Sequence, residues 1–149
     1  MENAITDLLD ALIPNLENLL GDIRSWMGIA MIIGPVIFIV MGLVYYFLAP
    51  PEANHKLGYR TYFGMGSVSA WKFTQKFAGI VWGGLGIVLA IVAISGWAVM
   101  VGQELSNATS TALTILIIEA VAAVLAFLTV EITVLMRYDI NGSLRKKKK

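Results

Sequence analysis

Three stretches of the chain are apolar almost throughout: residues 27–49, 78–101 and 112–136. Each is longer than the roughly 20 residues that an α-helix, rising about 1.5 Å per residue, needs to cross about 30 Å of hydrocarbon. A helix of this length in a water-soluble protein keeps a polar face, and these stretches have almost none. The pattern predicts an all-α membrane protein whose membrane domain, residues 27–138, has three transmembrane helices.

Residues 1–26 show a different pattern, in which apolar positions are mixed with acids. Leucine and isoleucine recur at three- and four-residue steps, which predicts an amphipathic helix before the first span. Its five acids are Glu2, Asp7, Asp10, Glu17 and Asp22. We favour a helix lying in the membrane interface, and the alternative is a helix that binds a partner on the outer face. Pro14 is expected to kink this helix or to divide it in two.

Composition agrees with a membrane protein, and the distribution of charge predicts its orientation. Hydrophobic residues make up 58% of the 149 residues and charged residues 14%, which is outside the usual range of soluble domains. Lysine and arginine gather between spans one and two and after span three, whereas the connection between spans two and three has none. For a protein of the cell (inner) membrane, the positive-inside rule then predicts an amino terminus outside and both basic segments in the cytoplasm. Residues 139–149 become a basic cytoplasmic tail, attracted to anionic lipid.

The sequence carries no group of residues arranged for catalysis or metal binding. The chain has no cysteine, which removes disulfides, thiolate nucleophiles and cysteine metal sites. The single histidine, His55, follows two prolines and has no acid at metal-ligand spacing. The basic tail lacks the interleaved aromatic residues of a nucleic-acid-binding surface. We therefore expect no enzyme, no cofactor, no metal and no nucleic-acid partner.

Span two carries a stripe of small residues at steps of four, three, four and three. The stripe consists of Gly79, Gly83, Gly86, Ala90 and Ala93. Small residues at this spacing let helix backbones approach closely in lipid. We expect the stripe to pack against spans one and three, and self-association into a homo-oligomer is the alternative. The helix is expected to begin in the preceding loop, where Ser67 or Ser69 can accept bonds from its first amide groups.

Span three contains two acids, Glu119 and Glu131. A carboxylate in hydrocarbon is costly unless it is protonated, paired or hydrated, so both acids are functional candidates. Their separation along the helix corresponds to a rotation of about 120°, so they do not share a face. Glu131 could snorkel to the inner interface or pair with a loop cation, and Arg60 is the cation that we expect. One hypothesis for the protein is thus a small accessory subunit of a membrane transporter or channel that uses these glutamates.

The connection between spans one and two, residues 57–79, combines charge, aromatic rings and glycine. It contains Gly58-Tyr59-Arg60-Thr61, then Trp71-Lys72, then Gln75-Lys76-Phe77-Ala78-Gly79. Its aromatic residues could anchor a loop at the depth of the lipid headgroups. The guanidinium of Arg60 offers five donors to a carboxylate or a lipid phosphate.

These motifs resemble the SdpI-like family of bacterial membrane proteins, in which a Gly-Tyr-Arg-Thr turn, a later tryptophan and an Ala-Gly step lead into a hydrophobic span. The resemblance extends from the end of span one through span three. It implies an immunity or signalling protein that protects its producer from a secreted, membrane-active toxin or recruits a protein partner to the membrane. The partner, a toxin or a subunit of a membrane complex, is then expected at the motif residues: Gly58, Tyr59, Arg60, Thr61, Trp71, Lys72, Lys76 and Gly79.

Overall fold

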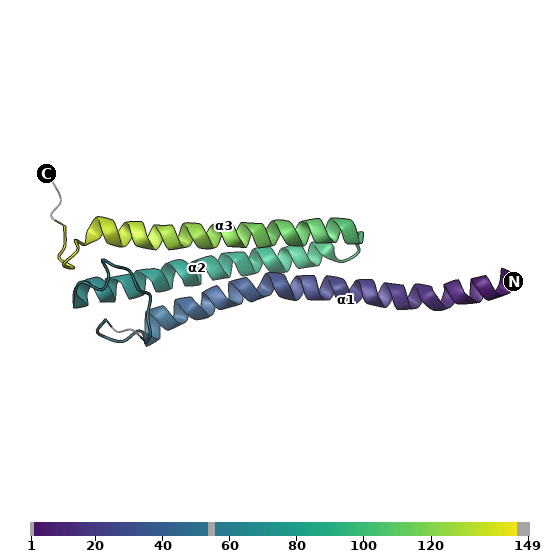
Figure 1. The fold of residues 1–149 in the computed structure, drawn as a ribbon, viewed down its shortest axis with the longest axis horizontal. Helices are drawn as coiled ribbons and strands as arrows, with labels where there is room; N and C mark the ends of the chain where they lie inside the picture. Colours follow the sequence, from purple (N-terminus) through teal and green to yellow (C-terminus); the bar gives the residue numbers. More distant parts are fainter. Residues whose placement is uncertain (1, 54–55, 146–149) are drawn as a thin grey trace.

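The computed structural model describes residues 2–53 and 56–145, with side chains from residue 18 onward, and this part of the chain forms three long helices (Figure 1). Helix α1 spans Glu2–Leu43 and continues as a short π-helix, η1, over Val44–Leu48. Helices α2 and α3 span Val68–Met100 and Leu105–Arg137. His55 and residues 146–149 lie outside the described residues.

Each of the three helices contains an apolar segment that is long enough to cross a membrane. The segments are Asn18–Leu48, Val68–Met100 and Leu105–Arg137. The predicted all-α class with three membrane spans is therefore confirmed. The helices of spans two and three have 33 residues each, so each is about 50 Å long and continues beyond the roughly 30 Å of a hydrocarbon core.

Helix α1 begins with the predicted amphipathic segment and enters the first span without a break. Figure 1 shows its amino-terminal part extending alone beyond the turn that joins α2 and α3. The helix is not divided at Pro14, because a single missing donor is tolerated among strong helix formers such as leucine and alanine. At the level of that turn, Arg24 Nη2 donates to the backbone oxygen of Gln103 at 2.6 Å and fastens α1 to the α2–α3 connection.

Helices α1 and α2 approach closely because glycines meet between them. A side chain at Gly42 would overlap the backbone of Gly83, and a Cβ at Gly79 would come within 2.9 Å of the Gly42 oxygen. A Cβ at Gly86 would lie 2.8 Å from the backbone oxygen of Pro35. The glycines of the small-residue stripe thus lie against α1 of the same chain.

The remainder of the stripe continues into an apolar cluster at the end of the bundle that holds the α2–α3 turn. Ala93 is fully buried there with Met31, and Ala90 is half-buried. Large apolar side chains cover the outside of the bundle instead, among them Ile80, Ile87, Val88, Ile91, Ile117, Val121, Val124 and Leu128. An apolar exterior of this extent fits a protein whose outer surface contacts lipid.

Candidate functional site

The motif residues gather at the end of the bundle where α1 ends, α2 begins and α3 ends (Figure 1). We call this the basic end and define it as the loop 49–67, the first turns of α2 and residues 138–145. Segments that are far apart in the sequence meet here, since the loop contacts both α2 and the residues that follow α3.

Gln75 of α2 holds the Gly-Tyr-Arg-Thr motif by its backbone. Its Oε1 accepts from Tyr59 N at 2.7 Å, and its Nε2 donates to Tyr59 O at 2.6 Å. Both bonds are buried, so one amide side chain satisfies the two backbone groups that the loop would otherwise leave unpaired. Gly58 has φ +120°, and a Cβ there would lie 2.7 Å from Trp71, so this position requires glycine.

Trp71 ties the end of the first span to the beginning of α2. Its ring is fully buried, and Nε1 donates to the backbone oxygen of Pro50 at 2.8 Å. Together with the Gln75 bonds to Tyr59, this bond fixes the loop at two points on neighbouring turns of one helix. The tryptophan of the motif is therefore a structural anchor.

Alternate residues of the motif point in opposite directions. Tyr59 and Thr61 are buried, whereas Arg60 and Tyr62 are exposed, Tyr62 by 72%. Thr61 Oγ1 accepts from Gly64 N at 2.7 Å and so closes the turn that follows the motif. The inward residues build the loop, and the outward residues are the ones a partner can reach.

Ser67, one of the two serines that the sequence offers as a cap, precedes the first residue of α2 and also holds the chain after α3. Its hydroxyl oxygen accepts from Ala70 N at 3.1 Å, and its O–H donates to Gly142 O at 2.7 Å. Asp139 Oδ1 accepts from the backbone N–H of Asn141 and of Ser143, at 3.0 and 2.8 Å, which forms a tight turn. Residues 139–145, expected as part of a tail, thus fold back onto the loop. The Asp-Ile-Asn-Gly sequence is the signal that could have predicted this turn.

The ring of Tyr59 lies beneath the loop, among residues of all three helical elements. It contacts the ring of Tyr45 edge-on at 5.5 Å between centroids, and that of Phe127 at 6.4 Å. Its hydroxyl is buried without a hydrogen-bond partner among the described residues. Burial, and to a smaller extent the nearby Glu131 carboxylate and Tyr45, raise the pKa of the Tyr59 hydroxyl far above its ordinary value.

The predicted ion pair between Arg60 and Glu131 is wrong, because these two residues form no ion pair in the described part of the chain. Glu131 is half-buried near Tyr59, and Arg60 is exposed. The reason is the alternation of the motif: when Tyr59 and Thr61 point inward, the side chain between them must point outward.

Glu119 lies apart from the basic end, between α3 and α1. Its side chain is 6% exposed, and Oε1 is buried without a hydrogen-bond partner among the described residues. A Cβ added to Gly34 would lie 2.6 Å from Glu119 Oε2, so the carboxyl group fills the place of a side chain beside Pro35. Glu119 and Glu131 therefore have separate surroundings, as their helical spacing predicts.

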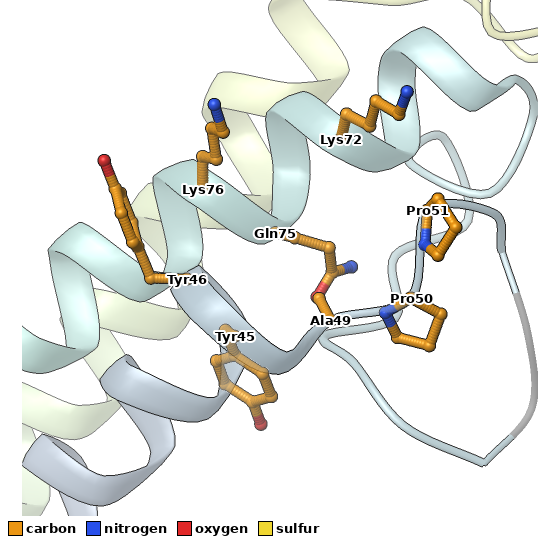
Figure 2. Close-up of a pocket in the computed structure, with 8 residues that line it drawn as sticks. All are labelled: Tyr45, Tyr46, Ala49, Pro50, Pro51, Lys72, Gln75 and Lys76. Carbon is orange, nitrogen blue, oxygen red and sulfur yellow. The ribbon is translucent and has the colours of Figure 1, made fainter.

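A cavity of about 330 Å³ opens at the basic end, between η1 and the first turns of α2 (Figure 2). It is lined by Tyr45, Tyr46, Ala49, Pro50, Pro51, Lys72, Gln75 and Lys76. Figure 2 shows the amino groups of Lys72 and Lys76 on one side of α2, with the hydroxyl of Tyr46 directed to the same side as Lys76. Gln75 points the other way, toward Ala49 and Pro50. The lining contains two basic residues and no acid.

The comparisons with known proteins find one match. The family model of the SdpI/YfhL protein family matches residues 51–131, more than half of the chain. The matched region begins in the loop, contains the whole of α2 and ends at Glu131 of α3, so it includes every motif residue described above. No curated protein and no solved structure matches the chain.

Proposed function

Because this chain belongs to the SdpI/YfhL protein family, we propose that it is a membrane immunity or signalling protein, which protects a cell against a membrane-active toxin or recruits a protein partner. It is a multi-pass membrane protein with three spans. The observation that carries the proposal is that some residues of the family motif hold the loop together while another is left exposed. Tyr59 and Thr61 are used to build the loop, and Arg60 is presented outward.

The exposed side of the loop has the chemistry of a protein-binding surface. Arg60 and Tyr62 are separated by one residue in the loop, and both side chains are exposed. Arginine and tyrosine are enriched among the residues that contribute most to protein–protein affinity. The predicted orientation places this surface in the cytoplasm, where its positive charge would favour an acidic partner.

The amino-terminal part of α1 supplies a second surface, on the opposite side of the membrane in the predicted orientation. This part of the helix extends beyond the rest of the bundle (Figure 1) and carries five acids before Arg24. Opposite charges steer encounter and speed association, so an acidic helix suits a cationic toxin. A helix of this kind would intercept the toxin before it enters the bilayer.

The proposal is tested by survival of a toxin-sensitive cell that expresses the chain. The secreted products of genes neighbouring its own are the toxins to apply, and membrane abundance is matched between strains by immunoblot. We expect the full chain to raise survival against one of these products. Deletion of residues 2–17 should weaken protection without preventing insertion, because the segment Asn18–Leu48 and the Arg24–Gln103 bond both remain. Equal survival with and without the chain, for every product tested, would refute the immunity proposal.

A second function, the accessory subunit of a transporter or channel, is favoured by the burial of Glu119. An intramembrane carboxyl group whose Oε1 has no partner among the described residues is a candidate for proton or ion traffic. Glu119→Gln separates the two functions, because glutamine keeps the size of the side chain and cannot ionise. The immunity proposal predicts unchanged protection in this variant. Proton or ion flux that the full chain supports and Glu119→Gln abolishes, at equal abundance and equal thermal stability, would favour the transporter subunit.

A further inference from the structure

The cavity between η1 and α2 has the charge of an anion site. Lys72 and Lys76 are exposed, lie one helical turn apart and form no ion pair with any residue in the described ranges. The hydroxyl of Tyr46 adds a neutral donor on the same side as Lys76 (Figure 2). The amide of Gln75, in contrast, is already bonded to the backbone of Tyr59. The lysines and the tyrosine are therefore the donors that a ligand would meet.

Along α2, the surface next to the cavity changes from charged to apolar within one turn of the helix. Along α2, the exposed side of Lys72 and Lys76 continues with exposed Ile80 and then Gly84. Phe47 and Leu48, at the end of η1, are 70% and 64% exposed. This order matches the parts of a lipid: the two cations suit the headgroup, the aromatic residue suits the interface, and the apolar surface suits the acyl chains.

We propose that this cavity binds the phosphate headgroup of one anionic phospholipid from the leaflet at the basic end. The ammonium groups of Lys72 and Lys76 contact the phosphate, and the hydroxyl of Tyr46 donates a hydrogen bond to the same headgroup. The acyl chains lie along Ile80 toward the middle of the bilayer. Basic pockets between transmembrane helices at the membrane surface bind anionic headgroups in this manner. A volume of about 330 Å³ is at the small end of ligand pockets, which suits a headgroup better than a folded protein segment.

A second basic cavity at the same end supplies the internal comparison. It has a volume of about 520 Å³ and lies between the end of α3 and the turn that follows, where Arg137 and Arg145 line it. Both arginines are engaged within the protein. The guanidinium of Arg137 lies 4.2 Å from the centre of the Phe73 ring, and Arg145 Nε donates to Tyr138 O at 2.9 Å. Lys72 and Lys76 have no such contacts with the residues that the structure describes.

The test measures lipid binding to the purified full chain in detergent by native mass spectrometry, with phosphatidylglycerol as the probe and phosphatidylcholine as the uncharged comparison. We expect the unmodified chain to retain phosphatidylglycerol preferentially. Lys72→Gln with Lys76→Gln should lower that affinity about 30-fold, since each basic residue near the surface contributes a factor of about five. The matched control, Arg137→Gln with Arg145→Gln, removes the same charge and should lower it only a few-fold. Lys72→Arg with Lys76→Arg should keep the preference and shows that the site tolerates substitution.

Three results would overturn the proposal. An equal loss of phosphatidylglycerol affinity in the double lysine variant and the double arginine variant would mean that total charge, and not this cavity, attracts the lipid. Inorganic phosphate or glycerol phosphate that binds without lipid as tightly as phosphatidylglycerol would assign the site to a soluble phosphate compound. If the Lys72→Gln, Lys76→Gln variant still binds phosphatidylglycerol fully but no longer protects cells, the lysines would be assigned to a protein partner. The proposal rests on the cavity alone, so it stands or falls independently of the immunity function.

Discussion

Replacing Gln75 with methionine should release the loop that carries Arg60. The two side chains have similar length, but methionine can neither donate to Tyr59 O nor accept from Tyr59 N, bonds that measure 2.6 and 2.7 Å. Each buried backbone group that loses its partner costs about 1–3 kcal/mol, so the loop should lose about 2–6 kcal/mol. Lys76→Met, on the next residue of the same helix, is the matched control. Its side chain is exposed, and it should change stability by no more than about 0.5 kcal/mol.

Limited trypsin digestion in detergent measures the effect where it occurs. Cleavage after Arg60 requires the loop to open, so its rate reports the free energy of local opening. A loss of about 2 kcal/mol raises the open population about 30-fold, and Gln75→Met should be cut at least that much faster. Global thermal unfolding should change less, because the helix contacts of α1 with α2 remain. Equal cleavage of Gln75→Met and Lys76→Met would refute the claim that Gln75 holds the loop.

The other predictions concern packing, pH and orientation. Gly86→Ala should cost about 1–3 kcal/mol in detergent unfolding, because its Cβ would meet the α1 backbone, whereas Gly84→Ala, with nothing within 4 Å, should be neutral or stabilising; equal effects would contradict the packing. The Tyr59 pKa is raised in the folded state, so the unfolded chain loses this proton first and stability should fall as pH rises above about 10. Tyr59→Phe should reduce this alkaline loss of folding stability and should cost little stability at pH 7. If the variant loses as much stability above about pH 10 as the unmodified chain, Tyr59 is not the source. A cysteine at Asn107 should be labelled in intact cells and one at Lys72 only after the membrane is broken, and the reverse pattern would invert the orientation.

The membrane spans could be predicted from the sequence because the thickness of the bilayer sets the minimum length of an apolar segment, whatever the contacts of its individual residues. Capping is equally local: the fit of a hydroxyl to the first amide groups left Ser67 and Ser69 as candidates, and Ser67 is the cap of α2. The apolar pattern alone places the beginning of span two at residue 78. The helix begins ten residues earlier, at Val68, since helix formation does not stop at the membrane surface.

The contacts of the site could not be predicted, because they join residues that are distant along the chain. Gln75 finds the backbone of Tyr59 sixteen residues away, and neither residue carries a local pattern that specifies the other. Complementary charge suggested Arg60 and Glu131 as partners, but charge says nothing about the side of the loop from which a side chain projects. The turn at Asp139 has a readable local sequence, yet its docking against Ser67 depends on how α2 and α3 meet.

Arg60 provides the most direct test of the account, because it is the motif residue that the loop presents to a partner. The measurement is toxin survival of cells that carry the full chain, Arg60→Ala, or Glu52→Ala as an exposed control from the same loop, at equal membrane abundance. We expect Arg60→Ala to lose protection while it keeps the thermal stability of the full chain, and Glu52→Ala to protect fully. Full protection by Arg60→Ala would contradict the assignment of this surface to partner binding.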